Sequence, residues 1–205
     1  MRGNNETSRK SFRVLGLDPA LAGATGYGVV ELEGTAARML RFGALRFAAR
    51  VDFSTRLREI HQMVAELVEE FAPDAVAVES VFAALNMRTA LKLAEVRGVI
   101  LLAAAQADVP TRSYSPREVK ASIAGYGGAS KQQMQQMVKV QLGLCELPEP
   151  ADAADALAVA LCHAHAARVE VQISRGIKSN QAAVTDGTRA LSRSHLPSTR
   201  IPVHR

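Results

Sequence analysis

The sequence contains few of the residues that stabilise secreted proteins or span membranes. Among its 205 residues are two cysteines and no tryptophan, and aromatic residues make up 4%. A disulfide framework needs more cysteines, and the spacing of Cys145 and Cys162 is not typical of a metal site. The longest apolar run, around 99–105, is too short to span a membrane, and the N-terminus lacks the apolar segment of a signal peptide. We therefore expect a reduced, cytoplasmic protein without a membrane segment.

The charge of the chain is distributed unevenly. A content of 48% hydrophobic and 22% charged residues is ordinary for a globular domain, but the net charge is +5. Residues 171–205 carry six cations against one acid, and residues 1–11 add +2, so residues 12–170 sum to −2. The main part of the chain is therefore not globally basic, while the tails can add non-specific attraction to a polyanion. Because both tails are polar and lack a sustained period, we expect residues 1–11 and 171–205 to be disordered.

Hydrophobic periodicity predicts one α/β domain over residues 12–170. Short apolar runs with short connections predict an antiparallel meander of three strands, at 12–18, 26–33 and 38–47. The period then changes, and the following segments alternate between helix and strand. They are a helix at 54–71, a strand at 74–79, a helix at 86–106, a strand at 110–114, a helix from 115, and helices at 130–142 and 151–168. This order predicts a mixed five-stranded sheet, with the meander joined by parallel strands and flanked by helices.

Four acidic residues stand at the ends of these elements. Asp18 closes the first strand, just before Pro19, and Glu79 closes the fourth strand. Asp152 and Asp155 are three residues apart, so a helix would place both on one face of its first turn. Two adjacent anions raise each other's pKa or bind a metal ion. The alternatives are an acidic turn that only begins a helix and acids that merely end strands in solvent.

The positions of these acids favour a common site. The first and fourth strands can be neighbours in an α/β sheet, and a helix packed beside them can bring its first turn to the same edge. Four carboxylates would then converge. Hard divalent cations such as Mg²⁺ and Mn²⁺ take oxygen ligands, and two of them can clamp a phosphodiester and activate water. The pattern therefore suits metal-dependent phosphoryl hydrolysis.

Several motifs give the chain a family resemblance over residues 12–168. They are Leu15-Gly-Leu-Asp-Pro19, Thr25-Gly-Tyr-Gly-Val29, Ala77-Val-Glu-Ser-Val-Phe82, Ala90-Leu-Lys-Leu93, Arg97-Gly98, Val119-Lys120 and Ala151-Asp-Ala-Ala-Asp-Ala-Leu-Ala158. Together they resemble the RuvC Holliday-junction resolvases. The resemblance implies an RNase H-like fold and a homodimer that acts symmetrically on four-way junction DNA in recombination and repair. It also implies Mg²⁺-dependent nicking that leaves 5′-phosphate and 3′-hydroxyl ends, and a branch-migration complex of the RuvA/RuvB type as a partner.

The resemblance also implies roles for single residues. The carboxylates that bind metal and catalyse would be Asp18, Glu79, Asp152 and Asp155, with two Mg²⁺ ions per site and Mn²⁺ as a substitute. Contacts to DNA would come from Phe82 near the exchange point of the junction, from Asn86, and from Lys120 and Lys131 near the scissile strand. The family's dimer contact uses the long second helix, which would explain why Gly98 interrupts it.

Two departures from the family pattern leave other functions open. Ala20 stands where the family has glycine, in a loop one residue longer than usual, and Leu85 stands where many members carry lysine. One alternative is therefore a junction-binding protein with weakened or lost catalysis. Another is an actin-like sugar or acetate kinase, whose first hairpin also carries an aspartate. Such kinases need a second half of similar size, for which this chain has no room.

Overall fold

The computed structural model describes residues 11–20, 24–80 and 86–193. The chain divides into two compact units, Met1–Ala166 and Ala167–Arg205. The first unit holds the sheet and the candidate site. None of the helices in the described ranges is long and apolar enough to cross a membrane.

Five strands form one mixed sheet, as the sequence predicts. They are β1 (Phe12–Asp18), β2 (Ala24–Glu33), β3 (Ala36–Arg46), β4 (Ala75–Glu79) and β5 (Thr111–Tyr114). Their order in the sheet is β3-β2-β1-β4-β5. Strand β2 is antiparallel to both β1 and β3, whereas β4 is parallel to both β1 and β5. The carboxyl ends of β1 and β4 therefore lie next to each other at one edge of the sheet.

Five helices follow the predicted segments. They are α1 (Phe53–Phe71), α2 (Met87–Gln106), α3 (Pro116–Ala124), α4 (Lys131–Gln141) and α5 (Ala151–Arg193). The first four begin at a side-chain cap, each of which accepts a hydrogen bond from a backbone amide three residues later. The caps are Asp52, Asn86, Ser115 and Ser130. These local signals explain why the predicted helix starts are close to the observed ones.

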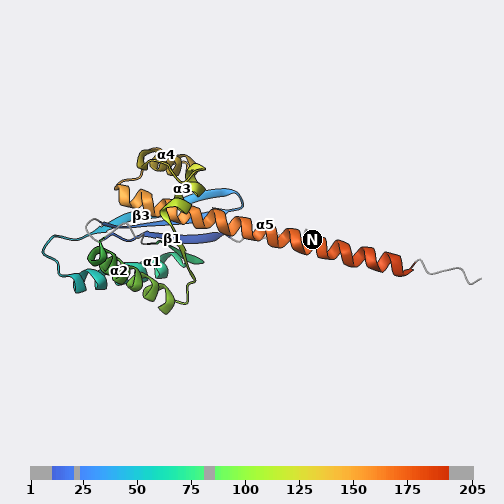
Figure 1. Ribbon diagram of the computed structural model, residues 1–205, viewed down its shortest axis with the longest axis horizontal. Helices are drawn as coiled ribbons and strands as arrows, with labels where there is room; N and C mark the ends of the chain where they lie inside the picture. The colour runs from blue at the N-terminus through green and yellow to red at the C-terminus, as the bar shows by residue number, and fades with distance from the viewer. Residues whose placement is uncertain (1–10, 21–23, 81–85, 194–205) are drawn as a thin grey trace, which may run out of the picture. The chain divides into compact units, whose positions relative to one another are not determined.

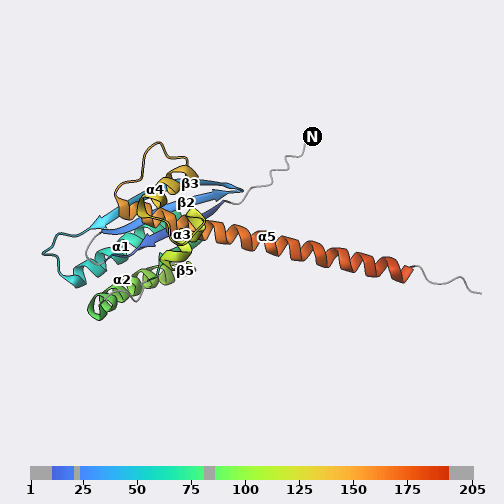
Figure 2. The same cartoon turned by 45° about the horizontal axis from the view of Figure 1, so that its top comes forward.

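The helices cover both faces of the sheet (Figure 1). Because side chains alternate along a strand, Leu15 and Leu17 of β1 pack in a core with α1 and α2, whereas Val14 packs with α3, α4 and the start of α5. Figure 2 shows α1 and α2 side by side beneath the strands. On the other face, α5 approaches β1 closely, since a methyl group on Gly16 would overlap the backbone of Ala156. The result is a three-layer α/β/α domain.

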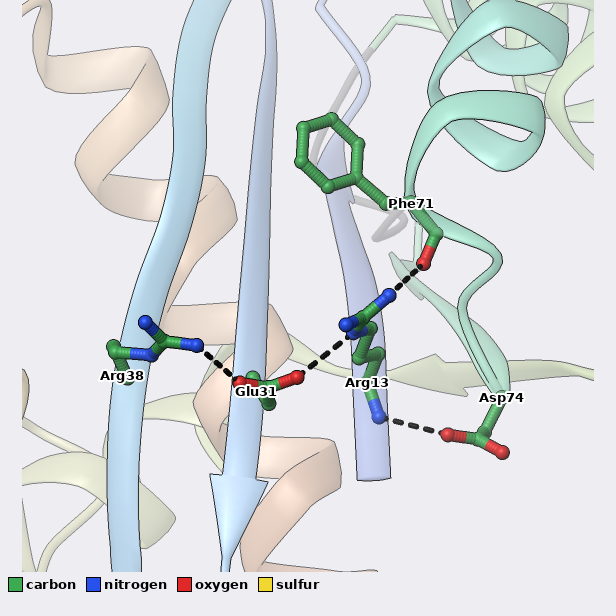
Figure 3. A network of polar contacts seen from close by, with 5 residues as sticks. All are labelled: Arg13, Glu31, Arg38, Phe71 and Asp74. Carbon is green, nitrogen blue, oxygen red and sulfur yellow. Dashed lines mark hydrogen bonds and ion pairs between the residues drawn. The ribbon is translucent and has the colours of Figure 1, made fainter. Parts of the chain in front are cut away.

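A buried acid, Glu31, connects side chains from three strands (Figure 3). The Glu31 side chain is 4% exposed and accepts hydrogen bonds from Arg13 Nε at 2.9 Å and Arg38 Nη2 at 2.6 Å. Arg13 also donates through Nη1 to the carbonyl of Phe71, and its backbone amide donates to Asp74. This network joins β1, β2 and β3 to the end of α1.

The last helix is longer than the sequence predicts. Where we expect a helix at 151–168 and a disordered tail from 171, α5 continues to Arg193, so the expectation of disorder is wrong for 171–193. No proline lies between Pro150 and Pro197, and proline is the strongest local signal that ends a helix. The polar composition was therefore a poor guide here. Residues 1–10 and 194–205 lie outside the described residues.

Candidate active site

Asp18 and Glu79 lie side by side because of the register of two parallel strands. Leu17 of β1 pairs with Val78 of β4, and the two acids are the next residue on each strand. Residues an even number apart on a strand point to the same face. Asp18 therefore shares the face of Val14, and Glu79 shares that of Ala77, which both pack in the core beneath α5. Both carboxylates are thus presented to the helix that carries the other two acids.

The first turn of α5 is held over this edge by a glycine. Gly26 pairs with Asp18 across β1 and β2, and a methyl group on Gly26 would overlap the backbone carbonyl of Asp152. Within the turn, Ala153 is buried while Asp152 and Asp155 are half-buried. The helix therefore buries its alanines and leaves the two acids beside Asp18 and Glu79.

Three of the four acids share one cavity. Asp18, Glu79 and Asp155 line a cavity of about 260 Å³ together with Lys120 and Lys131. The remaining walls come from Pro116 and Val119 of α3, Met134 of α4 and Ala158 of α5. Asp152 does not line this cavity. The structure thus brings together five of the residues that the sequence singles out.

The carboxylates strongly affect one another's protonation. Burial and the nearby charges of Glu79, Asp155 and Asp152 raise the pKa of Asp18 from its usual 3.8 to about 8. Burial and the charge of Asp155 raise the pKa of Glu79 to about 7, although Lys120 and Lys131 act in the opposite direction. Holding these acids ionised near neutral pH is therefore costly without an added cation.

Two basic side chains contact the acids of α5. Lys131 begins α4, directly after its cap, and its Nζ donates to Asp155 Oδ2 at 2.9 Å. This hydrogen bond raises the pKa of Lys131. Arg46 Nη2 lies 3.8 Å from Asp152 Oδ2. Sequence reasoning missed Arg46, although its position at the end of the third meander strand places it at the same edge of the sheet as Asp18.

The other predicted DNA contacts are placed differently. Lys120 lies on α3 and lines the cavity. Asn86 is exposed and caps α2, where its Oδ1 accepts from the amide of Thr89 at 2.9 Å, a structural role that the sequence analysis did not assign. Phe82 and Leu85 lie outside the described residues, as do positions 21–23 of the loop after Asp18.

The donor set suits a hard divalent cation. Asp18, Glu79 and Asp155 offer carboxylate oxygens, which Mg²⁺ and Mn²⁺ prefer, and the raised pKa values of Asp18 and Glu79 reflect a shortage of positive charge. In the described ranges, no three acidic, histidine or cysteine side chains already surround a single ion position. The residue types and the electrostatics therefore fit a divalent cation, although the side chains of the described residues are not arranged around one ion position.

The fold and the site together define an α/β protein with an acidic, lysine-edged cavity at the carboxyl ends of parallel strands. Comparison with known proteins gives the family. The model of the family "Crossover junction endodeoxyribonuclease RuvC" matches residues 14–163. The proteins of that name from Natranaerobius thermophilus and Chloroflexus aggregans are 46% and 47% identical. The alignments cover 78% and 76% of this chain, and 99% and 94% of the relatives.

Solved structures agree with this assignment. Thermus thermophilus RuvC is 39% identical, with a TM-score of 0.72, and the match covers 78% of this chain and 97% of that one. The same protein in complex with a Holliday junction substrate matches with a TM-score of 0.73, over 78% and 96% of the two chains. The chain therefore belongs to the RuvC family of crossover junction endodeoxyribonucleases. The mixed sheet with flanking helices, expected from the resemblance, is confirmed.

Proposed function

We propose that this protein is a structure-specific endonuclease that resolves four-way DNA junctions during recombination and repair in the cytoplasm. The observation that carries the proposal is the single cavity lined by Asp18, Glu79 and Asp155 with two lysines at its edge. Family membership supports it, because the related Thermus thermophilus protein was solved with a Holliday junction substrate. Symmetric nicks would leave 5′-phosphate and 3′-hydroxyl ends.

The acids are proposed to bind the metal. Asp18, Glu79, Asp152 and Asp155 would hold two Mg²⁺ ions, with Mn²⁺ as a substitute, because hard cations take carboxylate ligands and offset the mutual repulsion that raises the pKa of Asp18. Bound Mg²⁺ supplies a Lewis acid and a water activated for attack on a phosphodiester. The protein holds these four carboxylates in place through the register of β1 and β4 and the close packing of α5 on Gly26.

The lysines are proposed to stabilise negative charge on the phosphate. Lys120 and Lys131 stand on two different helices and line the same cavity. A fixed cation at the reacting phosphate stabilises the charge that develops there. We further propose that Asn86, which is exposed at the start of α2, contacts the DNA backbone, and that Phe82 stacks at the exchange point.

The second long helix is proposed to form the dimer contact. Met87, Leu91, Gly98 and Leu102 follow one side of α2, and the three large side chains are 76%, 58% and 53% exposed. No atom of the described chain would touch a methyl group added at Gly98, so packing within the chain does not explain this glycine. A second copy on this stripe would bury it and supply a second active site for the opposite strand. A branch-migration complex of the RuvA/RuvB type would then act on the same junction.

The proposal is tested with a fluorescent synthetic junction. Asp18→Asn and Asp155→Asn should each abolish nicking in Mg²⁺, while binding, measured by anisotropy in Ca²⁺, persists. Ligation of the products should restore full-length strands, as expected for 5′-phosphate and 3′-hydroxyl ends. Undiminished nicking by both variants would refute the assignment of Asp18 and Asp155 as catalytic residues. Junction binding without nicking by the parent protein would instead favour the alternative of a junction-binding protein with lost catalysis, which the Ala20 loop motivates.

A further inference from the structure

The helix α5 continues well beyond the part of the chain that its relatives share. The family model ends at residue 163, and relatives aligned over 156–160 residues are already covered to 94–99% of their own length. In this chain α5 runs on to Arg193. We call residues 167–193, the helical part of the second unit, the extension helix.

The extension helix carries a net charge of +3, from five cations against Glu170 and Asp186. Residues 171–205 carry six cations and one acid, whereas residues 12–170 sum to −2. The nuclease domain also places four carboxylates at the edge that must receive the DNA. A domain of this charge gains little attraction for a polyanion, and the extension supplies the missing charge.

The cations recur at helical spacing along the extension helix. They occupy positions 168, 175, 178, 189 and 193, separated by 7, 3, 11 and 4 residues. Because a helix has 3.6 residues per turn, these positions share one side of its backbone over a length of about 38 Å. Asp186 is the one acid on that side, so the side keeps a surplus of positive charge.

A different side of the helix is apolar. Val169, Ile173 and Ile177 are four residues apart and exposed. The extension helix is therefore two-sided, and the basic side can be tested separately from the apolar one.

We propose that the basic side of the extension helix binds the phosphate backbone of a DNA duplex arm. The proposal rests on the proposed function in that the substrate is DNA. It adds a contact that the shared family domain lacks. Arginine and lysine recognise phosphate by charge and hydrogen bonding, irrespective of base sequence. The contact is therefore independent of junction structure and equally available on linear duplex DNA.

The test is the salt dependence of binding by the full-length protein. Dissociation constants are measured by anisotropy, without Mg²⁺, on a four-way junction and on a linear duplex between 50 and 300 mM KCl. The variant combines Arg175→Gln, Lys178→Gln, Arg189→Gln and Arg193→Gln. Each lost phosphate contact lowers the slope of log K against log salt by about 0.9, so we expect the slope to fall by about 2 or more on both DNAs. The single-turnover nicking rate at saturating protein should stay within about 2-fold of the parent.

The matched control is Ile173→Gln with Ile177→Gln, which changes the apolar side and leaves every cation in place. We expect its slope to equal that of the parent, and circular dichroism should show equal helix content in all three proteins. An unchanged slope for the four-cation variant overturns the proposal, as does an equal loss of affinity in the apolar control. If the parent binds and nicks the junction but the slope does not change, only the extension proposal fails. A parent that binds neither DNA would refute both.

Discussion

The Nζ atom of Lys131 lies 2.9 Å from Oδ2 of Asp155. A lysine of α4 thus forms an ion pair with a carboxylate that we propose to bind metal. The pair is formed between residues 24 positions apart in the chain, at the starts of two helices. Lys131 offsets the charge of the acids in this structure, and we propose that it also faces the phosphate when DNA is bound.

Lys131→Gln should lower nicking and tighten metal binding. Loss of a charge beside the reacting phosphate should lower the single-turnover rate about 10²-fold or more. Because Lys131 no longer occupies Asp155, the Mg²⁺ concentration for half-maximal rate should fall. Both quantities come from a Mg²⁺ titration of junction nicking. Lys139→Gln, in the last turn of the same helix, should change neither, and a raised Mg²⁺ requirement in Lys131→Gln would contradict the competition.

Asp18→Asn should stabilise the metal-free protein at high pH. The pKa of Asp18 is raised from 3.8 to about 8, so the folded state holds this proton more tightly than the unfolded state does. The free energy of unfolding of the parent therefore falls progressively as pH rises from about 4 to 8, and the full loss is reached above pH 8. We expect the variant's Tm to exceed that of the parent by several degrees at pH 9, and by less at pH 5.

The stabilisation should disappear when Mg²⁺ is added, because the metal offsets the same repulsion in the parent. Scanning calorimetry with and without Mg²⁺ measures both effects. Glu146→Gln, which replaces an exposed acid that does not line the cavity, is the control and should show no such pH dependence. An equal Tm for the Asp18 variant and the parent at pH 9 would argue against crowding of the carboxylates.

Glu31→Gln should destabilise the fold without affecting nicking. Arg38 and Arg13 hydrogen bond to Glu31 and lower its pKa below the usual 4.5. The stabilisation is therefore present above pH 4.5 and is lost as pH falls through the lower folded value. We expect a loss of about 1–2 kcal/mol in the free energy of unfolding at pH 7, because both arginines are partly exposed and screened.

Urea unfolding at pH 7 and pH 3 tests this expectation, since the difference between variant and parent should shrink at the lower pH. Glu33→Gln changes an exposed acid on the same strand and serves as the control. If the difference in the free energy of unfolding between parent and variant grows on acidification, the prediction is contradicted.

Gly26→Ala should impair both stability and catalysis. A methyl group at this position would overlap the backbone of Asp152, so the first turn of α5 must move away from β2. Overpacking of this kind costs about 1–3 kcal/mol, and a displaced turn carries Asp152 and Asp155 with it. Urea unfolding and junction nicking should both reveal the loss. Gly98→Ala, where no described atom would be touched, should not reduce the stability of the isolated chain.

Leu91→Glu combined with Leu102→Glu should give a monomer. Both side chains are exposed on α2, and charges there would oppose burial against a second copy. Sedimentation velocity should show half the parent mass, and paired nicking of a junction should fall while the fold, followed by circular dichroism, is kept. The control Leu147→Glu changes an exposed leucine elsewhere on the domain. If the double variant is still a dimer, the dimer contact is not formed by α2.

The elements of the fold were predictable because they depend on neighbours in the chain. Short apolar runs before Asp18 and Glu79 predict strands that end in acids, and the caps Asp52 and Ser130 begin helices through bonds to amides three residues away. The sequence by itself thus determined the order of the elements and the four acids that stand at their ends.

Only the tertiary structure decided how these acids are used. The ion pairs of Arg46 with Asp152 and of Lys131 with Asp155 join segments far apart in sequence, and no local pattern encodes such partners. The register of β1 on β4 sets Asp18 beside Glu79, and Gly26 sets how closely α5 approaches them. Periodicity specifies which face of an element is buried, but the distance between two charged groups depends on how separate elements pack.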